Sequence, residues 1–241
     1  MILGGASAIG ERVTRLLASV GASLYLTGRD RVRIEQIAAD LRVRGASLVV
    51  VEQMDMTSTG VVGGVVSRAQ QALGGLDTLL IAAGLLPEQG RVSAEVGLLR
   101  ETLEINVTVP MTVLEEVALL FEHQGHGQIV AIGSVAGDRG RATNYAYGAA
   151  KGALEIFLSG LRQRLHKHGA QVLLVKPGFV DNPMTIAFKK GPLWASPERV
   201  ARDIVRAMAK GKSVIYTPWW WRWIMLVIRL IPEALFVRLR F

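Results

Sequence analysis

Short apolar runs alternate with amphipathic stretches along most of the chain. Segments such as 24–26 and 79–81 are continuously apolar, which is typical of strands that helices cover on both faces. The alternation predicts an α/β fold, with one domain over residues 1–217 built on a doubly wound parallel sheet with helices on both faces. Strands are expected near residues 23–27, 47–52, 78–82, 127–132, 171–176 and 213–216.

The first strand of this pattern is short. Only Met1, Ile2 and Leu3 precede a glycine-rich turn, whereas strands usually have five or six residues. The native start of the chain is therefore expected upstream of Met1. No cleavable signal peptide is expected, because the first methionine already lies in the predicted sheet.

The composition narrows the function classes. The 241 residues are 50% hydrophobic and 20% charged, which fits one large domain. The lack of cysteine excludes disulfides and thiolate catalysis and is compatible with a reducing compartment. The four histidines fall in a predicted loop and at a helix end, so solvated surface is expected and no metal site. A net charge of +8 leaves nucleic acid, an anionic membrane and an anionic substrate as candidate partners.

Ser134, Tyr147 and Lys151 carry the candidate chemistry. If residues 144–151 open a helix, Tyr147 and Lys151 lie one turn apart on the same face. A phenol has a pKa near 10, and an adjacent ammonium favours the phenolate, which would bring Tyr147 closer to a working general acid and base. Ser134, at the end of a predicted strand, can hold a substrate oxygen. A lone Tyr-x-x-x-Lys also occurs by chance on helix surfaces, so the rest of the chain decides.

The N-terminal turn has the strand, turn and helix order of a Rossmann-type dinucleotide site, with Gly4, Ser7, Ala8, Ile9 and Gly10 as candidate contacts. Gly4 permits the tight turn, Ala8 the approach of backbone to pyrophosphate, and Gly10 the packing of helix on strand. The phosphates are expected at the helix N-terminus. Alanine rather than glycine at position 8 narrows this space by one methyl group.

With these motifs in this order, the chain resembles a short-chain dehydrogenase/reductase over residues 3 to about 217. Asn106 in Ile-Asn-Val, Asp55, and Pro177-Gly178 after the sixth strand also match the family pattern. The resemblance implies that Asn106 holds a water in a proton relay through Lys151, that Lys151 binds the nicotinamide ribose, and that Asp55 contacts the adenine ring. Each match alone could be a helix cap or a turn, but their joint order argues against coincidence.

Two departures from the family pattern affect the expected cofactor pocket. Ile81-Ala82-Ala83-Gly84 stands where Asn-Asn-Ala-Gly is usual, so two stabilising asparagines are missing, although Ala83 and Gly84 are still expected beside the cofactor. Asn182 stands where a threonine commonly binds the nicotinamide carboxamide. Its amide can serve similarly, because it has both donor and acceptor groups. Val180, two positions earlier, is expected at the same site.

Cofactor choice is expected at the end of the second strand, where an acidic side chain would accept from a ribose 2′-hydroxyl and repel a 2′-phosphate. Arg29 occupies this region and offers a planar, charge-assisted fork to phosphate oxygens. NADPH is therefore the expected cofactor, with NADH as the alternative. Asp30 follows and could offset the charge, which would leave Arg29 a solvated loop residue.

A tail over residues 218–241 departs from the pattern of a solvated helix. Tryptophans at 219–221 and 223 precede aliphatic residues that Arg222 and Arg229 interrupt. The stretch 219–231 is too short to span about 30 Å of hydrocarbon, whereas an apolar, basic, amphipathic helix in the interface of an anionic membrane fits. Packing on the domain or in a subunit contact is the alternative. Nucleic acid is not expected, because the basic residues alternate with large aliphatic ones.

The tail indicates a lipophilic or lipid-linked ketone as substrate. Within the family, segments 135–141 and 189–193 and the closing Ile231-Pro232 resemble the reductases that complete 2-epimerisation of decaprenylphosphoryl ribose, which reduce a lipid-linked 2-keto-pentose. Arg139 and Arg141 are then placed to meet a substrate phosphate, unless their loop faces solvent. Alternatives are a 3-oxoacyl or steroid-like ketone reductase, and a nucleotide-sensing binding protein with weak catalysis.

The family resemblance also implies an assembly and a location. A homodimer or homotetramer would form through helices at 108–123 and 147–166. A cytoplasmic protein associated peripherally with the inner face of the membrane is expected. Arg29 departs from the narrower reductase resemblance, in which less commitment to a 2′-phosphate cofactor is expected.

Overall fold

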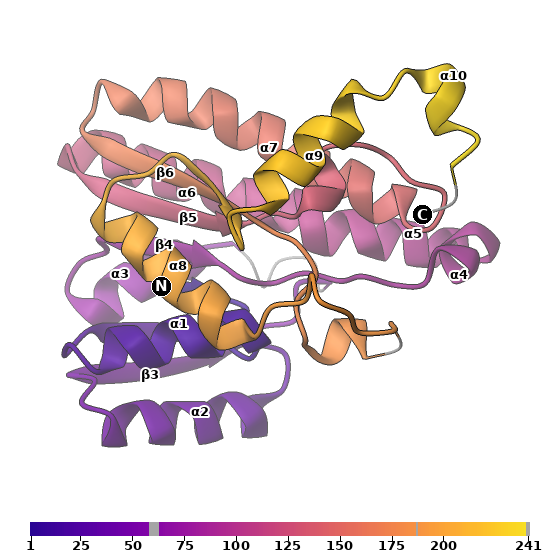
Figure 1. The fold of residues 1–241 in the computed structure, drawn as a ribbon. Helices are drawn as coiled ribbons and strands as arrows, with labels where there is room; N and C mark the ends of the chain where they lie inside the picture. The colour runs from indigo at the N-terminus through magenta and orange to yellow at the C-terminus, as the bar shows by residue number, and fades with distance from the viewer. Residues whose placement is uncertain (58–62, 187, 240–241) are drawn as a thin grey trace.

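The computed structural model describes residues 1–57, 63–186 and 188–239 (Figure 1). Among them, seven parallel strands form one sheet in the order β3-β2-β1-β4-β5-β6-β7. Each strand expected from the sequence is present within one residue of its predicted bounds, so the predicted parallel sheet is confirmed. The strands are β1 Ile2–Leu3, β2 Ser23–Gly28, β3 Leu48–Gln53, β4 Thr78–Ile81, β5 Gly127–Ile132, β6 Ala170–Pro177 and β7 Val214–Thr217.

The strand order reverses at the centre of the sheet. The chain runs outward from β1 to β2 and β3 and then returns to the other side of β1 to form β4. The last residue of β1, Leu3, is paired with the last residue of β4, Ile81. Ligands of doubly wound sheets bind outside the carboxyl ends of the strands at such a switch point.

Helices cover both faces of the sheet, as predicted (Figure 1). On one face lie α1 Ala8–Ala18, α2 Arg31–Val43 and α8 Pro197–Ala209. On the other lie α3 Val65–Leu73, α6 Val109–Gln124 and α7 Tyr145–His166. The remaining helices flank the carboxyl edge or end the described chain: α4 Gln89–Ala94, α5 Val96–Leu103, a π-helical turn at Glu104–Thr108, α9 Trp221–Leu230 and α10 Glu233–Phe236.

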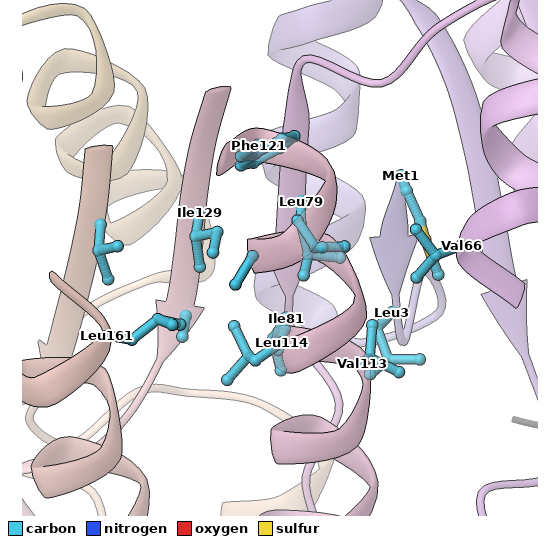
Figure 2. Close-up of a cluster of buried hydrophobic side chains, with 14 of the residues drawn as sticks. Met1, Leu3, Val66, Leu79, Ile81, Val113, Leu114, Phe121, Ile129 and Leu161 are labelled. Atoms are coloured by element: carbon cyan, nitrogen blue, oxygen red, sulfur yellow. The ribbon is translucent and has the colours of Figure 1, made fainter. Parts of the chain in front are cut away.

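Neighbouring residues of a central strand enter different cores. Leu79 of β4 belongs with Leu114 of α6 to one cluster (Figure 2), while Leu80 belongs to the cluster on the opposite face. This two-sided burial explains the continuous apolar runs of the sequence. Phe121 of α6 is fully buried in the first cluster. It fits there because position 127 is glycine, where a Cβ atom would lie 2.4 Å from the phenyl ring.

The C-terminal segment packs on the domain through one face of α9. Trp221 and Met225 are 2% and 0% exposed and form a cluster with Val135. The opposite face carries exposed residues, including Trp223 and Val227. In the described part of the chain, every helix is too short or too polar to cross a membrane. The helix is thus amphipathic, as predicted, but protein already covers its inner face. Residues 240 and 241 of the predicted tail lie outside the described residues.

Candidate active site

A pocket of about 300 Å³ opens at the carboxyl ends of β1, β4, β5 and β6. Predicted site residues that do not line it are Gly4, Gly10, Arg29, Asp55, Asn106 and Arg139. Most of the predicted residues do line it, and they come from five separate parts of the chain: Ser7, Ala8, Ile9, Ala83, Gly84, Ser134, Arg141, Tyr147, Lys151, Pro177, Gly178, Val180 and Asn182.

The glycine-rich turn forms the floor of the cofactor side. Ser7 caps α1, because its hydroxyl accepts a hydrogen bond from the Gly10 N–H at 3.1 Å. Gly4 has φ +86°, and a Cβ atom there would lie 2.5 Å from the backbone nitrogen of Ala83. A Cβ atom on Gly10 would lie 2.6 Å from the Ser7 hydroxyl. Both glycines therefore allow the start of α1 to lie close to β1 and β4, and Ala8 and Ile9 at this helix N-terminus line the pocket. The N-terminus of a helix favours an anion.

Ser134, Tyr147 and Lys151 meet in this pocket, as predicted. Ser134 follows β5, and its hydroxyl oxygen accepts a hydrogen bond from the Ala136 N–H at 3.1 Å. It lines the same pocket as Tyr147 and is close enough to influence the pKa of that side chain. Tyr147 and Lys151 lie in the first turns of α7, with the Lys151 Nζ 5.7 Å from the centroid of the Tyr147 ring. Lys151 is 4% exposed, and its Nζ donates to the Ile132 carbonyl oxygen at 3.1 Å. The strand end and the helix thus hold the three side chains at fixed places.

Burial dominates the acidity of both titratable groups. It raises the pKa of Tyr147 to about 12, and the Ser134 side chain opposes this rise only in part. Burial also lowers the pKa of Lys151 to about 8. The expected lowering of the Tyr147 pKa by Lys151 is therefore not seen in this structure, where burial is the largest cause and raises the pKa. At neutral pH Tyr147 keeps its proton, which suits a proton donor.

Asn106 holds the turn behind the pocket. It is fully buried in the π-helical turn, a rare geometry that often occurs at functional sites. Its Nδ2 donates to the carbonyl oxygens of Leu85 and Thr102 at 2.8 and 2.9 Å, and its Oδ1 accepts from the Leu85 N–H at 3.3 Å. A Cβ atom on Gly84 would lie 3.2 Å from this Oδ1 and 3.5 Å from the Lys151 Nζ. Asn106 therefore stabilises the turn after β4 although Ala82 replaces an asparagine there.

The two arginines of the loop after Ser134 have different surroundings. Arg139 points to the tail: one Nη donates to the carbonyl oxygens of Ile228 and Ile231, each at 2.6 Å, and the other to Glu233 at 2.7 Å. Its guanidinium also lies 3.7 Å from the Phe236 ring centroid. The structure thus corrects the prediction for Arg139, whose donors fasten the end of α9 outside the pocket. Arg141 does line the pocket.

The residues expected to select the cofactor lie at the ends of β2 and β3. Arg29 is exposed, and its carbonyl oxygen accepts a hydrogen bond from Gln53. Asp30 caps α2 by accepting from the Arg33 N–H at 3.0 Å, so its carboxylate serves the helix. Asp55 accepts from the N–H and hydroxyl of Thr57, and these hydrogen bonds lower its pKa. The Arg29 guanidinium makes no ion pair with the described residues.

On the nicotinamide side, Asn182 has a role in local structure. Its Oδ1 accepts from the Met184 N–H at 2.9 Å and its N–H donates to the Thr185 hydroxyl at 3.2 Å, which closes a capping box. The sequence interpretation missed Thr185, Asn144 and the apolar wall formed by Phe179 and Met184. For Asn144, its position three residues before Tyr147 was the available signal.

A buried ionic cluster beside the pocket was also missed. Lys176 is 1% exposed and binds Asp138 and, at 2.7 Å, both carboxylate oxygens of Glu155. Tyr216 donates to the second Asp138 oxygen at 3.0 Å. The cluster joins the loop after Ser134 to α7 and β6. The signal was a lysine directly after the apolar run 172–175, but its partners come from distant positions.

Comparisons with known proteins agree with this geometry. The family model described as short chain dehydrogenase matches residues 1–192. An uncharacterised oxidoreductase of Mycobacterium tuberculosis is 34% identical over 239 residues, which cover 99% of this chain and 96% of that protein. These matches favour an enzyme over the nucleotide-sensing alternative.

Two solved structures share the fold. The bulky-bulky ketone specific alcohol dehydrogenase from Comamonas testosteroni has a TM-score of 0.81 at 24% identity, covering 97% of this chain and 94% of its own. Gluconate 5-dehydrogenase from Burkholderia cenocepacia, in complex with NADP and tartrate, has a TM-score of 0.78 at 20% identity, covering 89% and 91%. At 20% and 24% sequence identity, these two structures show only that the fold is shared. The family model and the mycobacterial relative show that the chain belongs to the short-chain dehydrogenase/reductase family, as an NAD(P)-dependent oxidoreductase.

Proposed function

We propose that the protein is an NADPH-dependent reductase that converts a lipophilic ketone to a secondary alcohol. The observation that carries the proposal is that Ser134, Tyr147 and the buried Lys151 line one pocket, with the Lys151 Nζ 5.7 Å from the centroid of the Tyr147 ring. When bound, the nicotinamide supplies a hydride to the carbonyl carbon. Tyr147 donates its hydroxyl proton to the carbonyl oxygen, so the two additions together make the alcohol.

Ser134, Lys151 and Asn106 orient the substrate for Tyr147 and help to reprotonate it. The Ser134 hydroxyl holds the carbonyl oxygen beside Tyr147. Lys151 keeps its charge below a pKa of about 8, so it can bind the nicotinamide ribose and lower the cost of a developing phenolate. The Asn106 side chain and the Lys151 Nζ both lie beside Gly84. Asn106 supports a proton relay that returns a proton to Tyr147 by way of Lys151.

NADPH is preferred because Arg29 offers an exposed guanidinium at the end of β2. The carboxylate of Asp30 could repel a 2′-phosphate, but it accepts a hydrogen bond from the Arg33 N–H and so caps α2. The adenosine half would extend from the N-terminus of α1 toward Arg29 and Asp55. Asn182 and Val180 would contact the nicotinamide, and NADH remains the alternative cofactor.

The substrate side is largely apolar. Leu86, Val135, Phe179, Met184 and Phe188 line the pocket. Behind them, α9 packs directly on two pocket residues: a Cβ atom on Gly178 would lie 1.9 Å from the Trp221 Nε1, and Met225 contacts Arg141. These features support a large lipophilic ketone, for which we propose a lipid-linked keto-sugar. A 3-oxoacyl or steroid-like ketone is the alternative.

We infer that the outer face of the tail binds an anionic membrane surface at the cytoplasmic side. Trp219, Trp223 and Leu230 are 64%, 57% and 73% exposed, and Arg222 and Arg229 are exposed among them. Tryptophan and arginine beside aliphatic side chains suit the headgroup boundary. The test is flotation with anionic vesicles, comparing the wild type with a variant that has serine at 219, 223 and 230 and keeps the packed Trp221. Equal flotation of both proteins would contradict the membrane proposal.

Self-association through α6 and α7 is the proposed assembly, as a homodimer or homotetramer. Leu119 of α6 is 61% exposed and Ile156 of α7 is 76% exposed. Large exposed aliphatic residues on these helices support a protein contact there. Light scattering of the wild type and of Ile156→Asp tests it: the variant should give a smaller particle, and a monomeric wild type would refute the assembly.

The experiment that tests the function is NADPH oxidation by the purified protein with three classes of ketone: a polyprenyl-phosphate ketopentose, a 3-oxoacyl thioester and a ketosteroid. Turnover of the first class alone supports the lipid-linked sugar. Turnover of only the uncharged ketones keeps the reductase and discards that substrate. No turnover with any class, by a protein that binds NADPH, would contradict the proposed function.

A further inference from the structure

Two polar side chains that line the pocket each have a buried atom without a hydrogen-bond partner in the described part of the chain. The Nε of Arg141 and the Oδ1 of Asn144 are buried, and neither has a hydrogen-bond partner among the described residues. Both residues line the pocket that contains Ser134 and Tyr147. The Asn144 N–H donates to the Arg141 carbonyl oxygen at 3.1 Å, so one turn fixes both residues. Buried groups of this kind are rare in native proteins and call for an explanation.

Arg141 has a positive charge without a counter-ion in the described structure. Its Nη2 contacts only the Met225 sulfur, a weak acceptor, at 3.4 Å. Burial lowers the pKa of Arg141, and the negative charge of Asp138 opposes this only in part. Both Asp138 oxygens are already bound, one by Lys176 and one by Tyr216. An arginine keeps its proton, so an anion that enters the pocket could supply the counter-ion that the described residues do not.

The Asn144 side chain does not cap α7, because Gln89 accepts a hydrogen bond from the first turn of that helix instead. It precedes α7 at the position where an asparagine side chain usually caps the helix, yet it makes no cap hydrogen bond. Gln89 from α4 does this instead, because its Oε1 accepts from the Ala146 N–H at 3.0 Å. The Asn144 amide oxygen can therefore accept a hydrogen bond from a ligand hydroxyl.

We propose that Arg141 and Asn144 form a subsite for an anionic, hydroxyl-bearing part of the substrate. The inference rests on the proposed function, since it places this group beside the carbonyl held by Ser134 and Tyr147. Arg141 supplies charge-assisted donors to a phosphate or carboxylate, and Asn144 accepts from an adjacent hydroxyl. In a pocket with apolar walls, this pair selects a polar acidic head on a lipophilic molecule.

The test is calorimetric binding to the complex of the protein with NADP⁺, in which a ketone binds without turnover. Ribulose 5-phosphate and ribulose differ only in the phosphate, and 5-ketogluconate and sorbose differ only in the carboxylate. One desolvated charge-assisted contact should make the anionic member bind roughly 10- to 100-fold more tightly. The pair with the larger preference identifies phosphate or carboxylate as the source of the charge.

Two variants assign the preference to the subsite. Arg141→Leu should bring the anionic and neutral ligands to within about threefold of each other, since it removes the charge-assisted contact. Asn144→Asp should also weaken the preference without removing Arg141, because it places a negative charge in the pocket that repels an anionic ligand. Arg202→Leu removes an exposed arginine of α8 and is the matched control, for which the wild-type preference is expected.

Equal binding of anionic and neutral ligands by the wild type would overturn the subsite, as would a preference that survives in Arg141→Leu. Failure of the proposed function would look different. It would be a lack of NADPH oxidation with every ketone, which this binding experiment does not measure.

Discussion

Lys151 is expected to destabilise the fold that it serves. It is 4% exposed, its Nζ meets one carbonyl oxygen, and no carboxylate partner is described for it. The fall of its pKa from the ordinary 10.5 to about 8 corresponds to a cost of about 3 kcal/mol for holding the charge in the folded protein. Lys151→Met keeps the length of the side chain and removes this cost. Loss of the hydrogen bond to Ile132 costs about 1 kcal/mol, so the free energy of unfolding of the variant should exceed that of the wild type by about 2 kcal/mol.

The pH dependence of this gain follows from the sign of the shift. Below pH 8 Lys151 is charged in both the folded and the unfolded wild type, so the cost is fully present and the variant is more stable. Between pH 8 and 10.5 the folded wild type loses the proton first, its stability rises, and the gain of the variant disappears. Urea unfolding of both proteins without cofactor at pH 6.5 and pH 9.5 measures this. NADPH oxidation should fall by orders of magnitude in the same variant.

Lys176→Met is the matched control, for which the free energy of unfolding should fall rather than rise. Lys176 is equally buried but binds Asp138 and Glu155, and these partners raise its pKa above the ordinary value. Its removal leaves carboxylates without a counter-ion and should cost about 3 to 5 kcal/mol. A Lys151→Met variant that is less stable than the wild type at pH 6.5, or a gain that does not change with pH, would refute the reasoning.

Further predictions concern the cofactor and the tail. Arg29→Leu should raise the KM for NADPH roughly 10- to 100-fold and leave the KM for NADH nearly unchanged, because one charge-assisted contact with the 2′-phosphate is lost. Steady-state kinetics with both cofactors checks this, and equal changes for the two would contradict the role of Arg29. Gly178→Ala should displace α9, since the new Cβ would lie 1.9 Å from the Trp221 indole nitrogen. A red shift of tryptophan emission and a loss of about 1 to 3 kcal/mol in unfolding free energy are expected. An unshifted spectrum would show that α9 does not pack there.

The sheet could be predicted from the sequence because its signal is local. Runs such as 79–81 alternate between two cores and are short, so the hydrophobic pattern alone predicts the strands. Gly4 and Gly10 were predictable for the same reason, since the turn that requires them is contiguous in the chain. Ser134, Tyr147 and Lys151 could be assigned because they fall at the end of a strand and in the first turns of a helix.

The rest of the site depends on contacts between distant positions. Arg139 was expected in the pocket, but residues about ninety positions later supply carbonyl acceptors and a carboxylate that hold it. Trp221 was expected at a membrane surface, yet the missing side chain of Gly178 leaves room for its indole. The acidity of Tyr147 also could not be predicted, because the extent of burial is a property of the whole fold.

The central claim is that Tyr147 donates the proton, and Tyr147→Phe tests it most directly. The variant removes one hydroxyl and keeps the ring. The measurement is single-turnover NADPH oxidation with the best ketone found, together with the NADPH dissociation constant of both proteins. The account predicts a rate lower by roughly 10²- to 10⁴-fold with the dissociation constant unchanged. A rate within a few fold of the wild type would contradict the assignment of Tyr147 as the acid.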